Sequence, residues 1–177
     1  AFANVPCQAT IDAFLRDLEA PVHHPRWKER VPRDRGASWD FEDVRDHYLE
    51  LLFGVSARAL RHDDPARYLA ASRVTSGEIM ARVLAEFRRD GSPCRGALVF
   101  TLRDVWPGAG FGLFDAFGRP KAAMHLASRS LAARALLPVD EGVNGLDVHL
   151  ANDREQAWEG TLQARLVRDG EVEVGRG

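Results

Sequence analysis

The spacing of hydrophobic residues changes near Pro138. Before this position, apolar residues recur every three or four positions, as in amphipathic helices. After it they alternate with polar residues, as in strands that expose one face to solvent. The net charge changes at the same place, because residues 138–177 carry four arginines against nine carboxylates. We therefore predict two structural units, residues 1–137 and residues 138–177.

The first unit contains several helix signals. Thr10 and Asp40 are suitable N-caps, and Asp64 followed by Pro65 is a typical helix start. The connection over residues 21–39 is expected to be irregular, and long loops of this kind are often functional. The predicted helices cover residues 9–18, 40–54, 63–89 and 119–136. Their expected core residues include Phe41, Val44, Leu51, Leu69, Val74, Val83, Leu84, Phe87, Ala123 and Leu131.

A continuous apolar run occupies residues 97–102, with the sequence Ala-Leu-Val-Phe-Thr-Leu. A run without alternation is typical of a strand buried on both faces, as in a parallel sheet covered by helices. Residues 103–118 are rich in glycine and aromatic residues and are predicted to be loop. The order of helix, buried strand, loop and helix predicts an α/β fold.

Alternating residues in the second unit predict antiparallel strands. Leu146, Val148 and Leu150 alternate with polar residues, and so do the segments 162–166 and 172–174. Asp169-Gly170 is a hairpin signal between the last two. We interpret these runs as the first strands of a β-sandwich.

The composition limits the function classes. The chain is 45% hydrophobic and 28% charged, which is typical of globular domains, and it contains no apolar stretch of the roughly 20 residues that cross a bilayer. Cys7 and Cys94 are far apart and favour a reducing cytoplasm over a disulfide framework or a zinc site. A net charge of −2, and acidic residues within the arginine-rich segment 26–35, argue against a nucleic-acid partner. Abundant alanine and arginine, with lysine only at positions 28 and 121, indicate a GC-rich bacterial genome.

Both ends of the sequence have the character of internal segments. The chain begins with Ala1 rather than methionine, and residues 171–177 have the pattern of a strand interior. We therefore expect a piece of a larger protein, whose compartment this sequence does not define.

Two separated motifs resemble one enzyme family. They are Gly96-Ala-Leu-Val-Phe-Thr-Leu-Arg-Asp-Val-Trp-Pro107 and Asp115-Ala-Phe-Gly-Arg-Pro-Lys121. They resemble the last barrel strand and last helix of family 2 glycoside hydrolases, in particular the β-mannosidase branch, with its approximate patterns G-A-L-V-W-Q-L-N-D-x-W-P and D-x-x-G-R-x-K. The resemblance covers most of residues 40–150, and Asn4-Val5-Pro6 is weakly similar to the stretch after the nucleophile strand.

The resemblance implies a fold and a reaction. Residues 1–137 are expected to be the last helices and last strand of a (β/α)₈ barrel, and residues 138–177 the first strands of an Ig-like β-sandwich. The parent enzyme is expected to hydrolyse β-linked sugars, most simply β-mannosides, with retention and with neither metal nor organic cofactor. Retention requires two carboxyl groups about 5 Å apart. The resemblance places both before residue 1, so the segment alone is expected to be inactive, with the rest of the parent chain and a carbohydrate as its partners.

Three residues at the exit of the predicted barrel strand are candidate sugar-binding residues, because active sites of such barrels lie at the carboxyl ends of the strands. Trp106 is expected to stack on a pyranose ring, the alternative being a purely packing role. Asp104 is expected either to contact sugar or to bind loop backbone. Arg103 stands where the family commonly has asparagine, and is expected either to bind an acidic sugar or to pair with Asp104.

Other signals are weaker. The carboxylates of Glu50, Glu78 and Glu86 are expected on solvated helix faces, and His23-His24 lacks a third metal ligand. Residues 108–112 are predicted to be a flexible glycine loop rather than a phosphate cradle. Two alternative functions are a non-catalytic carbohydrate-binding or structural remnant, and a helical interaction module with an appended β domain. The sequence upstream of residue 1 distinguishes the first from the enzyme, and a strand over residues 97–102 argues against the second.

Overall fold

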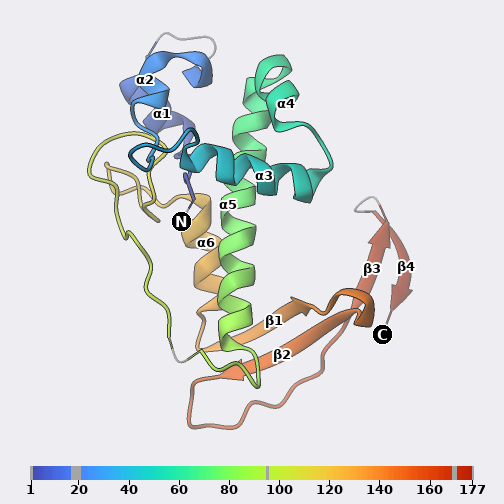
Figure 1. Ribbon diagram of the computed structural model, residues 1–177. Helices are drawn as coiled ribbons and strands as arrows, with labels where there is room; N and C mark the ends of the chain where they lie inside the picture. Colours follow the sequence, from blue (N-terminus) through green and yellow to red (C-terminus); the bar gives the residue numbers. More distant parts are fainter. Residues whose placement is uncertain (1, 17–20, 95, 169–170, 177) are drawn as a thin grey trace.

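A computed structural model describes residues 2–16, 21–94, 96–168 and 171–176 (Figure 1). These residues form six α-helices and two separate antiparallel hairpins. Among them, no helix is both long enough and apolar enough to cross a bilayer. The elements are α1 (Gln8–Phe14), a 3₁₀ turn (Pro21–His23), α2 (Pro25–Lys28), α3 (Phe41–Phe53), α4 (Ala57–Asp63), α5 (Pro65–Arg88), α6 (Ala122–Ser130), β1 (Arg134–Asp140), a 3₁₀ turn (Gly142–Asn144), β2 (Leu146–Asn152), β3 (Arg165–Arg168) and β4 (Val172–Arg176).

Helix α5 is the central element, and it contacts α3, α4, α6 and β1. Its predicted start is confirmed, since the Asp64 side chain accepts a hydrogen bond from the Arg67 amide and Pro65 occupies the first turn. Its predicted core face is confirmed only in part. Leu69 and Leu84 are buried as predicted, whereas Val74, Val83 and Phe87 are exposed. The buried side also carries small residues, among them Ser72, Thr75, Ser76 and Gly77. Small residues bring α6 close, because a Cβ at Gly77 would lie 2.7 Å from Leu126 Cδ1.

Helix α3 also has the predicted ends. Asp40 and Asp43 form a reciprocal capping box, and Gly54 ends the helix in the left-handed conformation with φ of 62°. The predicted core face is again confirmed only in part. Phe41 packs against the core and Val44 is partly buried, but Leu51 is 67% exposed, and Glu42 and Arg45 are fully buried.

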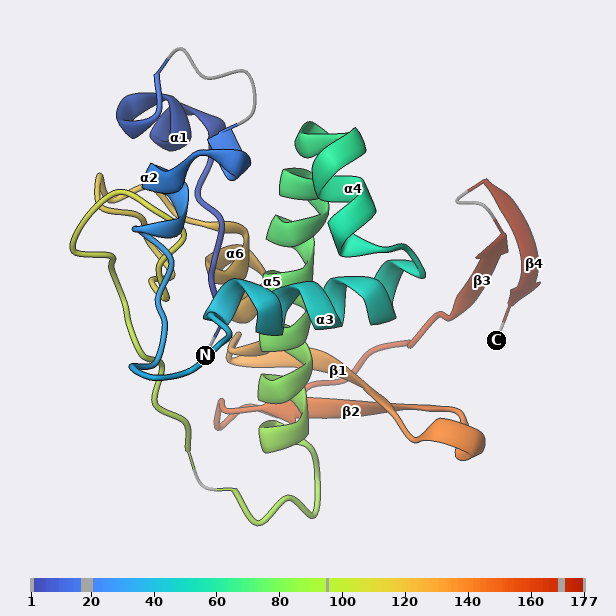
Figure 2. The same cartoon turned by 45° about the horizontal axis from the view of Figure 1, so that its top comes forward.

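The predicted strand over residues 97–102 is absent. No residue of this segment belongs to a strand, and Leu98, Phe100 and Leu102 are exposed. Figure 2 shows it within an extended connection that lies apart from both hairpins. The physical reason is that a buried parallel strand needs neighbouring strands to pair with, and the described residues place none beside it.

The predicted helix over residues 119–136 is too long at both ends. Helix α6 stops at Ser130, and the chain then forms β1, which sequence reasoning missed. Strand β1 pairs with β2 from Arg134 opposite Asn152 to Asp140 opposite Leu146. Ala135, Leu137 and Val139 alternate inward and pack with Ala85 of α5, so β1 spans the predicted boundary between the two units.

Of the other predicted strands, those over 146–150 and 172–174 are confirmed, and the run 162–166 is confirmed only at its end, because β3 begins at Arg165. Strand β2 covers the alternating run from Leu146, and β3 and β4 pair antiparallel on either side of the predicted turn. The turn itself, Asp169-Gly170, lies outside the described residues. The two hairpins are separate two-stranded sheets, so the partial barrel and the sandwich stay predictions.

Candidate functional site

The two sequence motifs meet at a buried ion pair between Asp104 and Lys121. The two side chains are 4% and 1% exposed. The Lys121 ammonium donates to Asp104 Oδ2, and to the backbone oxygen of Asn4 at 2.9 Å. Asp104 Oδ1 accepts a 2.7 Å bond from the Gly112 amide. Burial lowers the pKa of Lys121, and the adjacent carboxylate opposes this effect only in part.

A second cluster surrounds Asp115 of the second motif. Its Oδ1 accepts 2.9 Å hydrogen bonds from the amides of Phe117 and Arg119. Its Oδ2 accepts from the hydroxyl of Thr10, which also accepts a 2.8 Å bond from Arg119 Nη1. Burial alone raises the pKa of Asp115, but these bonds outweigh burial and lower it. Thr10 therefore anchors α1 to this loop and is not the predicted N-cap, a position that Cys7 occupies.

The glycine loop over residues 108–112 is closely packed against its surroundings. The prediction that this loop is flexible is therefore corrected. A Cβ at Gly112 would lie 2.6 Å from the Asp104 amide nitrogen and 2.5 Å from the Phe114 carbonyl oxygen. A Cβ at Gly110 would collide with the Asp104 carboxylate. The glycines are thus required so that backbone can approach the ion pair.

A pocket of about 260 Å³ opens beside this loop. Trp106, which is 55% exposed, lines it with Val105, Phe100, Phe111 and Pro32. Aromatic faces with a few polar groups are typical of small-ligand sites. Of the three candidate residues, Trp106 is the one that offers a large free surface to this pocket.

The other two candidates are held by the protein itself. Asp104 touches the pocket, but both of its oxygens accept hydrogen bonds from Lys121 and Gly112. Arg103 is exposed and donates to the Ala116 carbonyl oxygen. Asp104 therefore pairs with Lys121 and not with Arg103.

A buried ionic network around Glu42, which sequence reasoning missed, joins α2, α3, α4 and α5. Glu42 accepts hydrogen bonds of 2.8 Å from Trp27 Nε1 and from Arg61 Nη1. Lys28 Nζ lies 2.7 Å from its Oε2, and Arg45 Nη2 lies 3.2 Å from its Oε1. The sequence signal that could have predicted this network is the helical spacing of Glu42, Arg45 and Leu49, which places all three on one face of a helix.

The network continues to Asp46 and Tyr68. The Tyr68 hydroxyl donates to Asp46 at 2.9 Å and accepts a 2.5 Å bond from Arg45 Nη2. Burial raises the pKa of Asp46, and Arg45 only partly counters it. Glu42 and Asp46 are one helical turn apart, yet Glu42 is 0% exposed and no substrate reaches it. This carboxylate pair stabilises the fold and does not form a catalytic pair.

Acidification should destabilise the chain through Glu42. Burial alone raises the pKa of Glu42, but Arg45, Arg61 and Lys28 outweigh it and lower the pKa to about 2, from 4.5. A lowered folded-state pKa means that the contribution is complete above pH 4.5 and is lost as the pH falls toward about 2. Asp46, with its raised pKa, opposes part of this loss. Urea unfolding across this range should show falling stability, with a smaller fall in Glu42→Gln; equal slopes would contradict the assignment.

The remaining candidates are the three predicted solvated carboxylates and the histidine pair. Glu50 and Glu86 are exposed, as predicted. Glu50 accepts from the Ala57 amide at 2.9 Å, Glu86 pairs with Arg89 at 2.9 Å, and Glu78 is half-buried. His23 lies 3.0 Å from the Arg61 carbonyl oxygen, and His24 caps α2.

Comparison with known proteins relates the chain to glycosidases. No family model matches it. Over 92% of its length, in 183 aligned residues, it is 25% identical to "Beta-mannosidase B" of Neosartorya fischeri and of two strains of Aspergillus fumigatus. The chain spans 20% of the length of these curated relatives. The relatives are fungal, so they lend no support to the bacterial origin that the composition indicated.

Proposed function

We propose that this chain is the C-terminal segment of a retaining family 2 glycoside hydrolase that acts on β-linked sugars, most simply β-mannosides. The similarity to β-mannosidase B along 92% of the chain carries the proposal. The polar network of the motifs supports it, because Asp104, Asp115, Arg119 and Lys121 together fix the loop that presents Trp106.

In this proposal, hydrolysis proceeds through two carboxyl groups supplied by the rest of the longer protein. One attacks the anomeric carbon while the other protonates the leaving oxygen, and the second then activates water to release the sugar. The present chain supplies the wall of the sugar subsite. Trp106 stacks against the apolar face of the ring, and the buried Asp104–Lys121 pair keeps its loop in place.

The exposed run 97–102 counts against the barrel part of this proposal, because a buried strand was predicted there and the segment forms none. Leu98, Val99 and Phe100 border a second cavity, of about 410 Å³, whose other wall includes Met80 and Leu84 of α5. Several large apolar residues here have no cover in the described residues. We propose that another part of the longer protein covers this apolar surface.

Replacing Trp106 with alanine in the longer protein should lower kcat/KM for aryl β-mannosides. Ring stacking contributes about 0.5–1.5 kcal/mol in addition to the burial of apolar area. Its loss corresponds to roughly a 2- to 13-fold decrease in kcat/KM. The decrease should include kcat, because a wall that holds the ring near its transition-state shape acts in the chemical step.

Trp158→Ala is the matched control, since Trp158 is 39% exposed, a similar partial exposure, but does not line this pocket. We expect it to leave kcat/KM unchanged. Unchanged kcat/KM in a folded Trp106→Ala variant would assign Trp106 to packing. Glycan binding by a longer protein that hydrolyses no β-linked sugar would favour the carbohydrate-binding remnant instead.

A further inference from the structure

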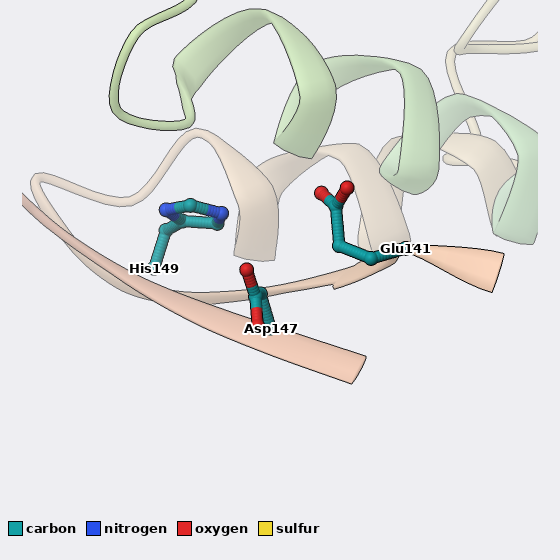
Figure 3. A group of neighbouring side chains, drawn as sticks. All are labelled: Glu141, Asp147 and His149. Carbon is teal, nitrogen blue, oxygen red and sulfur yellow. The ribbon is translucent and has the colours of Figure 1, made fainter. Parts of the chain in front are cut away.

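A group of metal-ligating side chains lies at the β1–β2 hairpin, far along the chain from the sugar-site motifs. Asp147 and His149 are alternate residues of β2, and Glu141 directly follows β1. Their nearest ligand atoms all lie within 4.8 Å of one another. Figure 3 shows the Glu141 carboxylate and the His149 imidazole directed toward the helices, with Asp147 between them.

The hairpin fixes this grouping by its register. Asp147 pairs with Val139 and His149 with Leu137, so both side chains share the face of the sheet that packs toward α5. Glu141 is held by a tight turn, in which its amide donates to the Gly145 carbonyl oxygen at 2.8 Å. The three ligands therefore come from a paired framework and not from a free loop.

His149 provides an independent sign of a missing ligand. Its Nε2 atom is buried, and it has no hydrogen-bond partner among the described residues. A buried imidazole nitrogen without a partner is costly, and metal coordination is one of the few ways to satisfy it. Asp147 is exposed and so leaves a path by which an ion can enter.

The local charge also fits a cation. Arg89 lies 2.6 Å from one oxygen of Glu141 and 2.9 Å from Glu86, so it neutralises one charge among three carboxylates. The Glu86, Glu141 and Asp147 carboxylates with this one guanidinium leave a net charge of −2, which a divalent ion balances. The second oxygen of Glu141 is not engaged by Arg89.

We propose that Glu141, Asp147 and His149 bind a divalent transition-metal ion, with zinc as the best chemical match. One imidazole and two carboxylates suit zinc, which accepts three protein ligands and leaves a fourth position for water. Zinc ligands lie about 2.0–2.2 Å from the ion, so a tetrahedral arrangement needs only small side-chain movements from the present spacing. The ion clamps the turn that follows β1 to β2.

Calorimetric titration of the metal-free longer protein that contains this segment, with zinc chloride, tests this site. We expect one saturable site, and a thermal midpoint that rises with zinc. His149→Ala and Asp147→Asn should each weaken binding by about 100-fold or more, because loss of a group that merely supports a ligand already costs 10- to 100-fold. His125→Ala, at an exposed position of α6, is the matched control and should bind like the native chain.

Arg89→Gln gives a result that misfolding cannot produce. It removes the competing cation from Glu141 and should tighten zinc binding. Cobalt(II) bound to the native chain should give visible absorption typical of low coordination number, which His149→Ala should lose. Absence of saturable binding in the native chain, or equal affinity of His149→Ala and His125→Ala, would overturn the proposal.

Discussion

Glu42→Gln should lower the free energy of unfolding by about 3–5 kcal/mol, the usual cost of removing one partner from a buried ion pair. The variant leaves Arg45 fully buried with one anion fewer, and Arg61 and Lys28 lose the same partner. Because this carboxylate binds residues of α2, α3 and α4, and Arg45 links it to Tyr68 of α5, the effect should appear in the global transition. Urea unfolding followed by far-UV circular dichroism measures it.

Glu29→Gln is the matched control for this substitution. Glu29 is exposed and forms no ion pair among the described residues, so we expect a change within about 0.5 kcal/mol. Similar stabilities of the two variants would show that the Glu42 network contributes little net free energy.

Lys121→Met should also cost about 3–5 kcal/mol, because it leaves the Asp104 carboxylate buried without its cation. The double variant Asp104→Asn/Lys121→Met should recover part of the loss, since it removes both charges. Arg103→Met, at an exposed position of the same loop, is the control and should stay near native stability. Additive losses in the double variant would contradict the coupling between the two motifs.

The predictable parts of the fold are those with local determinants. The start of α5 depends on Asp64 and Pro65, and α3 lies between the cap at Asp40 and the αL residue Gly54. Strand β2 follows from alternation alone. In each case the interactions that define the element lie within a few residues of it.

The missed parts depend on partners distant in sequence. The apolar spacing of α3 did not predict the burial of Glu42 and Arg45, because their charges bond with Trp27 and Tyr68 of other helices. The sequence of β1 is compatible with a helix, and it is the pairing with β2 that makes this segment a strand. The run 97–102 has the composition of a buried strand. The sequence of the run does not indicate whether other strands lie beside it to form a sheet.

The candidate site was partly predictable for the same reason. The motifs located Asp104 and Trp106, but their different roles depend on Lys121 and on residue Asn4, at the other end of the chain. Glu141 and His149 carried no motif, because the hairpin register brings them together.

The most direct test of the proposed function is the stereochemistry of hydrolysis by the longer protein that contains this segment. Incubation with an aryl β-D-mannopyranoside and immediate proton NMR should show β-mannose as the first product, which then mutarotates. The 177-residue chain alone should release no mannose under the same conditions. Failure of the longer protein to cleave the β-mannoside, or formation of α-mannose first, would contradict the proposal.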